Sequence, residues 1–333
     1  MLHNGELFTR LFNTPYFRAC HEESPLSAQP HHIQIGLRAH QLAVIQRMVD
    51  LEKELQKGID LSGETLKSRF AILGDAVGVG KSLMVLGHIS RVREENRNFY
   101  IEELNPASSR NMYSLRERTF PDLSNCPALI IVPHTLYRQW QSYIDTQTTL
   151  KPYYIKTKRN FDGNFLSKVC ASDVVMISNT LVGNFLQLVN DKIFFSRTYI
   201  DEADTIHISS TKPMPNTHFI WFITASWPNL IFENERIWIS HATVQRITAS
   251  PDFLQNDVVF QHQMLNALVG QRGYFNRYYA CSPLYFSEYL RIQHPYRSHV
   301  VVRCRDSFIE QSINLPPLFS QVIECQPLSL IHI

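Results

Sequence analysis

The sequence predicts an α/β fold in which helices cover both faces of a parallel β-sheet. Five short apolar runs rich in branched residues have the length and composition of buried strands: 70–73, 128–132, 174–178, 198–200 and 219–224. Apolar residues at helical spacing follow three of these runs, at 83–92, 136–144 and 181–189. Because strands that alternate with helices pair in parallel, this order predicts a sheet buried between two helical layers.

Four further segments complete the predicted arrangement. An amphipathic helix at 37–58 precedes the first strand. The charged stretch 93–127 is longer than a usual connection, which predicts a surface insertion. Basic and aromatic residues mix at 151–161, which favours an exposed strand with one buried aromatic face over a basic stacking surface. Toward the C-terminus we expect a helix at 252–269 and strands at 300–303 and 322–325.

The composition fits a folded chain that does not contact a membrane. Of the 333 residues, 44% are hydrophobic and 19% are charged, and no apolar run reaches the ~18 residues of a membrane span. The N-terminus lacks the order of a secretory signal, and the six cysteines form neither a C-x-x-C pair nor a cluster with histidine. We expect a soluble, intracellular protein. Because the net charge of the protein is only +2, any nucleic acid would have to bind a local basic surface.

A glycine-bearing turn, DAVGVGKS, joins the first predicted strand to the first helix. Gly78 and Gly80 let the backbone around Val79 curl closely, so that several N–H groups can meet one triphosphate at the helix N-terminus. The Lys81 ammonium can then reach the β- and γ-phosphates, and the Ser82 hydroxyl can bind Mg²⁺. We therefore predict ATP and Mg²⁺ as cofactors.

The match to the strict phosphate-loop pattern is partial. The pattern G-x-x-x-x-G-K-[ST] has glycine where this chain has Asp75. The alternative is a chance glycine turn before an ordinary helix, with Lys81 solvated. The strand, turn and helix context favours the phosphate loop.

The strand predicted at 198–200 runs directly into the acidic sequence D-E-A-D. In a phosphate-loop protein, Asp201 would hold Mg²⁺ through its waters, and Glu202 would orient and deprotonate the attacking water. Such a tetrad by itself is more often a solvated loop or a helix N-cap. Its place on the same predicted sheet as the phosphate loop favours the catalytic interpretation.

With these motifs, the chain resembles the superfamily-two helicases and, within them, the Swi/Snf-like DNA-dependent ATPases. The resemblance lies in the order of seven segments: LRAHQ at 37–41, DAVGVGKS at 75–82, LIIVPHTLYRQW at 129–140, VVMISNTL at 174–181, YIDEAD at 199–204, FITASWPNL at 222–230 and SINLPPLFSQVIEC at 312–325. It implies the first RecA-like lobe of a P-loop NTPase. The stretch VVVRCRDSFIEQSINLPP is most similar to the helicase-like ATPases of large DNA viruses.

The resemblance also implies roles for residues outside the phosphate loop. Gln41 would read the adenine, while Thr224 and Ser226 would couple nucleotide state to lobe movement, although Ala225 and Trp227 replace the family's glycine and proline. The residues expected to contact a nucleic-acid backbone are His134, Arg138, Asn179 and Thr180. The family's Trp, here Trp140, lies along the nucleic-acid strand, and ordinary helix packing is the alternative.

The implied function is ATP hydrolysis that drives movement on double-stranded DNA. Two alternatives stay open: a DEAD-box RNA helicase, disfavoured by the segments Val132–Thr135 and Thr224–Ser226, and a nucleotide-gated nucleic-acid-binding scaffold with little hydrolysis. A transcription or remodelling complex is the expected partner. The expected location is the nucleus, or the virion and host cell for a viral protein.

The motifs also suggest how the chain is divided. We expect an N-terminal extension at 1–36, the ATP-binding lobe at 37–232 and a C-terminal extension of that lobe at 233–327. Residues 328–333, LSLIHI, resemble a translated sequencing adapter and are expected to be non-native. Every motif belongs to the first of two lobes, so we expect the second lobe to be absent and the isolated chain to hydrolyse ATP negligibly.

Overall fold

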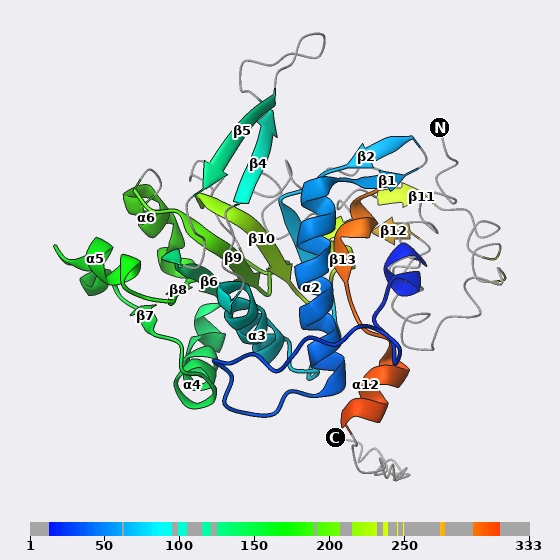
Figure 1. The fold of residues 1–333 in the computed structure, drawn as a ribbon, viewed down its shortest axis with the longest axis horizontal. Coiled ribbons are helices and arrows are strands. Elements are labelled where there is room, and N and C mark those ends of the chain that lie inside the picture. Colours follow the sequence, from blue (N-terminus) through cyan, green and yellow to red (C-terminus); the bar gives the residue numbers. More distant parts are fainter. Residues whose placement is uncertain are drawn as a thin grey trace, which may run out of the picture.

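Seven parallel strands form the central sheet of the protein (Figure 1). The computed structural model describes residues 13–61, 63–94, 99–104, 115–120, 125–189, 192–206, 215–231, 236–238, 245, 249, 274–276 and 296–313. The strands are β3 (Phe70–Leu73), β6 (Ala128–Val132), β7 (Pro152–Ile155), β8 (Val174–Ser178), β9 (Phe195–Asp201), β10 (Thr217–Ile223) and β13 (Val301–Val302). Their order is β13-β3-β10-β9-β6-β8-β7, and every neighbouring pair is parallel. The predicted α/β, RecA-like class is therefore confirmed.

The five strands predicted from apolar runs are all present. Every residue of β6, β8, β9 and β10 is buried, which explains why continuous apolar runs rather than alternating patterns signalled them. The strand expected at 300–303 is the short β13, which pairs with β3. The strand expected within 151–161 is β7, an edge strand whose neighbouring lysines are exposed. The helix expected at 252–269 and the strand expected at 322–325 lie outside the described residues.

Helices cover the sheet on both faces. The main ones are α2 (Ala39–Lys57), α3 (Lys81–Glu94), α4 (Tyr137–Gln147), α5 (Phe165–Cys170) and α6 (Asn179–Val189). Helix α3 packs against both α2 and α4, and in Figure 1 α2 and α3 cross in front of the strands. Helices α3 and α4 connect β3 to β6 and β6 to β7, so the chain moves toward the β7 edge of the sheet. Helices α5 and α6 connect β7 to β8 and β8 to β9, so the chain then moves back in the opposite direction. Because parallel crossovers are right-handed, the two pairs lie on opposite faces.

The stretch predicted as a surface insertion is a β-hairpin. Strands β4 (Phe99–Leu104) and β5 (Leu115–Phe120) pair antiparallel and project beyond the end of the sheet in Figure 1. Helix α3 extends to Glu94, so the insertion begins slightly later than the expected residue 93. Two smaller antiparallel pairs join β1 (Ile59–Leu61) to β2 (Glu64–Leu66) and β11 (Arg236–Trp238) to β12 (Tyr274–Asn276).

Segments from both ends of the chain pack on this lobe. Cys20 forms a parallel bridge with Cys304, and Ile33 forms an antiparallel bridge with Thr148 at the end of α4. The N-terminal segment therefore runs along one edge of the molecule from β13 to α4, as the dark blue trace of Figure 1 shows. Helix α12 (Asp306–Ile313) continues from β13 and packs against α2. Residues on both sides of the predicted 37–232 range thus pack against it.

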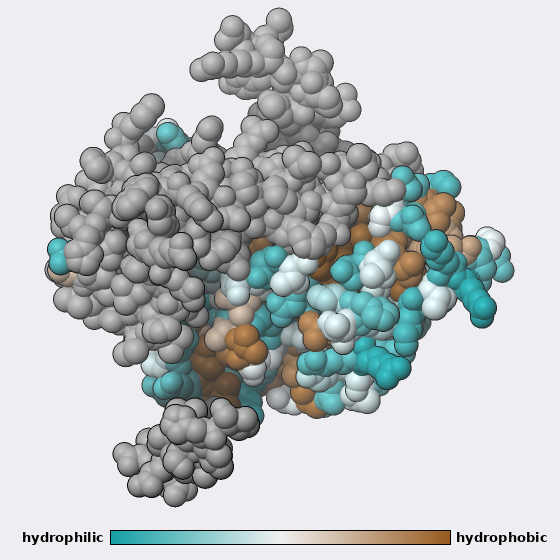
Figure 2. Space-filling view, turned by 180° about the vertical axis from the view of Figure 1, so that it is seen from behind, coloured by the Kyte–Doolittle hydropathy of each residue, from teal (hydrophilic) through white to brown (hydrophobic). Residues whose placement is uncertain are grey.

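On the part of the rear face that Figure 2 shows in colour, hydrophilic and hydrophobic residues are interspersed. Within the described ranges, no helix combines the length and apolar composition needed to cross a membrane.

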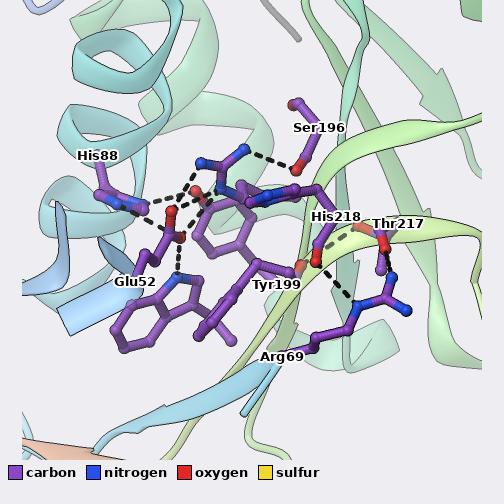
Figure 3. A network of polar contacts seen from close by, with 10 residues as sticks. Glu52, Arg69, His88, Ser196, Tyr199, Thr217 and His218 are labelled. Atoms are coloured by element: carbon purple, nitrogen blue, oxygen red, sulfur yellow. Dashed lines mark hydrogen bonds and ion pairs between the residues drawn. The ribbon is translucent and has the colours of Figure 1, made fainter. Parts of the chain in front are cut away.

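A buried polar network joins α2 and α3 to the sheet (Figure 3). The Glu52 carboxylate on α2 accepts hydrogen bonds from the Arg197 guanidinium on β9, at 2.6–3.0 Å, and from Trp221 Nε1 on β10, at 2.8 Å. His88 on α3 lies 3.7 Å from the same carboxylate and shares a 2.8 Å hydrogen bond with the Tyr199 hydroxyl. Burying a charge is costly unless it is paired, and each of these contacts reduces that cost.

Candidate nucleotide-binding site

The predicted nucleotide-binding residues follow strands that end at the same edge of the sheet. Strand β10 lies between β3 and β9, and its residue Ile223 pairs with Leu73 on one side and with Asp201 on the other. The phosphate loop after Leu73, the acidic residues at Asp201 and the turn beginning at Thr224 therefore emerge at one level. Ligands of open α/β sheets bind at this carboxyl edge.

The phosphate loop has the backbone that its glycines predicted. Gly78 and Gly80 have φ angles of 85° and 90°, in the left-handed region that side chains rarely adopt. A Cβ at Gly78 would meet no atom within 4 Å, whereas a Cβ at Gly80 would lie 2.3 Å from Gln41 Nε2. Gln41, predicted to read the adenine, therefore packs directly against the loop.

Lys81 lies at the junction between this loop and α3. Its ammonium donates to the carbonyl oxygens of Asp75, at 3.0 Å, and Ala76, at 2.7 Å. Burial lowers the pKa of Lys81, while the charges of Asp75, Glu202 and Asp201 counteract that shift. The acidic motif is thus close enough to Lys81 for its charges to influence the lysine.

Asp201 is buried at the end of β9, with 6% of its surface exposed. Its Oδ2 accepts a 2.6 Å hydrogen bond from the indole Nε1 of Trp140 on α4. Burial raises the pKa of Asp201, and the Trp140 hydrogen bond counteracts this shift. Trp140 itself is 1% exposed, so the expectation that it lies along a nucleic-acid strand is wrong. The sequence motif that contains Trp140 did not indicate the hydrogen bond to Asp201, because α4 and β9 come together only in the tertiary fold.

Glu202 has an unusual backbone. Its φ of 47° makes it the one non-glycine residue with positive φ among the described residues. Such conformations cost about 1–3 kcal/mol and gather at functional sites. Burial and the charges of Asp201 and Asp204 raise the pKa of Glu202. The side chain is only half-buried, so the carboxylate is available to solvent or a ligand.

One of the two predicted coupling residues, Thr224, contacts the acidic motif directly, and the other, Ser226, contacts Thr224. Thr224 Oγ1 donates to Asp204 Oδ1 at 2.6 Å and accepts the backbone N–H of Ser226 at 2.9 Å. Thr224 is buried, whereas Ser226 is exposed. Ala225 stands in this turn where the family has glycine, and the turn still contacts the acidic motif through Thr224.

Asp75 explains the departure from the strict phosphate-loop pattern. Its Oδ1 accepts the backbone N–H of Cys304 at 2.6 Å, and the residue is 1% exposed. The preceding Gly74 donates its own N–H to the Val302 carbonyl at 2.8 Å. Asp75 therefore belongs to the packing between the loop and the segment after β13, on the interior side of the loop.

His40, to which no sequence motif pointed, also contacts the phosphate loop. Its Nε2 lies 3.0 Å from the Val79 carbonyl oxygen in the phosphate loop, and its Nδ1 lies 2.8 Å from Ser312 Oγ on α12. The ring is fully buried, and burial lowers its pKa. His40 stands one residue before Gln41, so the segment LRAHQ holds the loop with two successive side chains.

The predicted nucleic-acid contacts gather after β6 and β8. The backbone N–H of His134, in the 3₁₀ turn His134–Leu136, donates to Asn179 Oδ1 at 3.2 Å, which joins the two loops. His134, Arg138 and Thr180 are exposed, and Asn179 is half-buried. The structure therefore brings His134 and Asn179 together and leaves the side chains of His134, Arg138 and Thr180 exposed.

The residues present fit a magnesium-bound nucleotide. The loop is open beside Gly78, and the Lys81 ammonium at the start of α3 can meet phosphate oxygens. The hydroxyl of Ser82 and the carboxylate of Asp201 are oxygen ligands of the kind that Mg²⁺ prefers. Ser82 is half-exposed in the first turn of α3, where the helix N-terminus favours anions.

Comparison with known proteins identifies similar sequences. The family model described as SNF2-related domain matches residues 40–218. The chain is 27% identical to the DNA repair protein RAD5B of Arabidopsis thaliana over 177 residues, which make up 49% of this chain and 14% of that protein.

Two solved structures are also similar. The Sulfolobus solfataricus SWI2/SNF2 ATPase core in complex with dsDNA has a TM-score of 0.40 and 15% identity, over 60% of this chain and 34% of that chain. The Sulfolobus solfataricus SWI2/SNF2 ATPase core domain has a TM-score of 0.46 and 14% identity, over 90% of this chain and 49% of that chain. The chain thus spans less than half the length of each of these relatives.

Proposed function

The chain belongs to the SNF2-related domain family, and we propose that it is the ATP-binding lobe of a DNA-dependent ATPase that couples hydrolysis to movement along duplex DNA. The observation that carries this proposal is the convergence of Lys81, Asp201 and Glu202 at the carboxyl edge of one sheet, where their charges influence one another. A phosphate-binding cation beside a metal-binding carboxylate and a general base is the minimum that nucleotide hydrolysis requires.

Each residue has a role in this proposal. The backbone N–H groups around Gly78, Val79 and Gly80 bind phosphate oxygens, and the Lys81 ammonium exchanges its loop carbonyls for the β- and γ-phosphates. Gln41 recognises the adenine from its position against Gly80.

Ser82 and Asp201 would hold Mg²⁺, which neutralises charge on the phosphate oxygens when bound. Glu202 accepts the proton of the attacking water, and its raised pKa brings it closer to the pH at which a general base is most effective. Thr224 bonds both Asp204 and the backbone of Ser226, so a shift of Asp204 would move this turn. In this way Thr224 and Ser226 would couple the nucleotide state to lobe movement.

The nucleic acid is proposed to bind where the loops after β6 and β8 meet. His134, Arg138, Asn179 and Thr180 offer neutral and cationic donors for phosphates, and contacts of this kind position a strand without reading its sequence. A remodelling or repair complex is the proposed setting, and the nucleus is the proposed location. The division into an N-terminal extension, a lobe and its C-terminal extension remains part of the proposal.

Phosphate release measured with and without polynucleotide tests the function. The assay uses the 333-residue chain and any longer chain that contains it, with duplex DNA, single-stranded RNA or neither. We expect the 333-residue chain to hydrolyse ATP negligibly and duplex DNA to raise the rate of the longer chain. In the longer chain, Glu202→Gln should keep ATP bound while slowing hydrolysis at least 100-fold, the lower range for a lost general base. Stimulation of the longer chain by RNA alone would favour an RNA helicase, and ATP binding without stimulated hydrolysis in the longer chain would favour a nucleotide-gated scaffold.

A further inference from the structure

Trp140 connects the polynucleotide-facing end of α4 to the metal-binding carboxylate. The 3₁₀ turn His134–Leu136 leads without interruption into α4, and Trp140 lies in the first turn of that helix. Arg138, two residues earlier, is exposed, while the Trp140 indole points inward and donates to Asp201 Oδ2 at 2.6 Å. The two residues therefore face opposite sides of one helical turn.

The indole constrains the carboxylate of Asp201. Asp201 and Trp140 are both buried, so water does not compete for this hydrogen bond. A donor fixed on one oxygen limits rotation of the carboxylate about its χ angles. Hydrogen bonds of this kind orient metal ligands, and their loss typically reduces metal affinity 10–100-fold.

The position of the donor also distinguishes it from ordinary core packing. The second indole that donates to a buried carboxylate among the described residues is Trp221, which bonds Glu52 Oε1 at 2.8 Å. That contact lies within the polar network that Glu52 on α2 forms with His88 on α3 and Arg197 on β9 (Figure 3). Trp140 instead meets the carboxylate at the end of β9, beside the turn that holds Thr224.

We infer that Trp140 is a positioning residue, which holds the Asp201 carboxylate in the orientation that binds Mg²⁺ together with a nucleotide. This inference rests on the proposed function, because it requires Asp201 to be a magnesium ligand. Trp140 does not touch the nucleotide itself. Its removal should therefore weaken the response to Mg²⁺ while leaving metal-free nucleotide binding unchanged.

Indole resonances of the ¹⁵N-labelled chain test the contact without any change to the site. The Trp140 signal is assigned by its absence from Trp140→Phe, and the Trp221 signal by its absence from Trp221→Phe. Adding Mg²⁺ to the chain saturated with ADP should shift the Trp140 signal and leave the Trp221 signal in place. A Trp140 signal that ignores Mg²⁺ while ADP is bound would overturn the inference.

Titration of the two variants supplies the second measurement. At saturating ADP, Trp140→Phe should need about 10–100 times more Mg²⁺ for half-saturation than the parent chain, whereas Trp221→Phe should need the same amount. Both variants remove one indole hydrogen bond to a buried carboxylate, so a general loss of stability would affect them alike. Equal Mg²⁺ requirements in all three proteins would overturn the inference alone. A parent chain that binds neither ADP nor Mg²⁺·ADP would instead overturn the proposed function.

Discussion

Replacing Glu52 with glutamine removes the charge at the centre of the buried network while keeping the size of the side chain. Burial would raise the pKa of this carboxyl, but the Arg197 guanidinium and the neighbouring His88 lower it from 4.5 to about 2. At about 1.4 kcal/mol for each pKa unit, that difference corresponds to roughly 3 kcal/mol of stability at neutral pH. Breaking a buried ion pair costs about 3–5 kcal/mol, which agrees with this value.

The pH dependence follows from the direction of the shift. The unfolded chain binds a proton at Glu52 near pH 4.5, before the native chain does, so this contribution is complete above pH 4.5 and is lost as the pH falls toward 2. His218, whose pKa is influenced by the charge of Glu52, adds a second pH dependence. Burial and then the Arg197 charge lower its pKa from 6.5 to about 3, so its contribution is present above pH 6.5 and declines as the pH falls toward 3.

Urea unfolding followed by circular dichroism between pH 7 and pH 3 measures these effects. We expect Glu52→Gln to lower the free energy of unfolding by about 3 kcal/mol at pH 7, with the difference from the parent chain shrinking below pH 4.5. The control is Glu54→Gln on the same helix, whose carboxylate is 40% exposed and pairs with Arg47, and which should cost less than about 1 kcal/mol. Equal losses in the two variants, or a difference that does not change with pH, would refute the reasoning.

Three further predictions concern the candidate site. Lys81→Ala should lower ATP affinity about 10–100-fold in calorimetry without unfolding the chain, because a charged hydrogen-bond donor is lost; unchanged affinity would contradict the phosphate-loop assignment. Gly80→Ala should weaken nucleotide binding, since its Cβ would displace Gln41 and its φ of 90° disfavours a side chain, whereas Gly163→Ala, with open space around it, should not. DNA affinity should fall with salt, and Arg138→Ala should reduce the slope of that dependence by about one in a fluorescence titration; affinity indifferent to salt would exclude backbone binding.

Apolar runs and glycine spacing predicted most of the sheet and the phosphate loop, because these features depend on local sequence. A fully buried parallel strand needs a continuous apolar run, and a phosphate loop needs glycine where φ is positive. The strands β3 and β10 and the φ angles of Gly78 and Gly80 agree with those rules. The same reasoning expected only three residues of β9, since Arg197 interrupts its apolar pattern.

Arg197 explains why the apolar pattern predicted only part of β9. A charged residue in a strand ordinarily signals an exposed position, but Glu52 lies 145 residues away in the sequence and neutralises it in the core. No local signal distinguishes a paired buried arginine from a solvated one. The pairing exists only because the fold brings Glu52 on α2 beside Arg197 on β9.

The sequence by itself determined which segments form the main strands and helices and which residues the proposal assigns to a nucleotide, because these depend on neighbours a few positions apart. Only the tertiary structure decided which distant groups support them. Trp140 bonds Asp201, His40 joins the phosphate loop to Ser312, and Cys304 caps Asp75. Each of these contacts links elements separated by 39 to 272 residues. Hydrogen bonds of this kind form where the packing of the sheet and helices brings two polar groups together away from water, and that proximity is a property of the fold rather than of any segment.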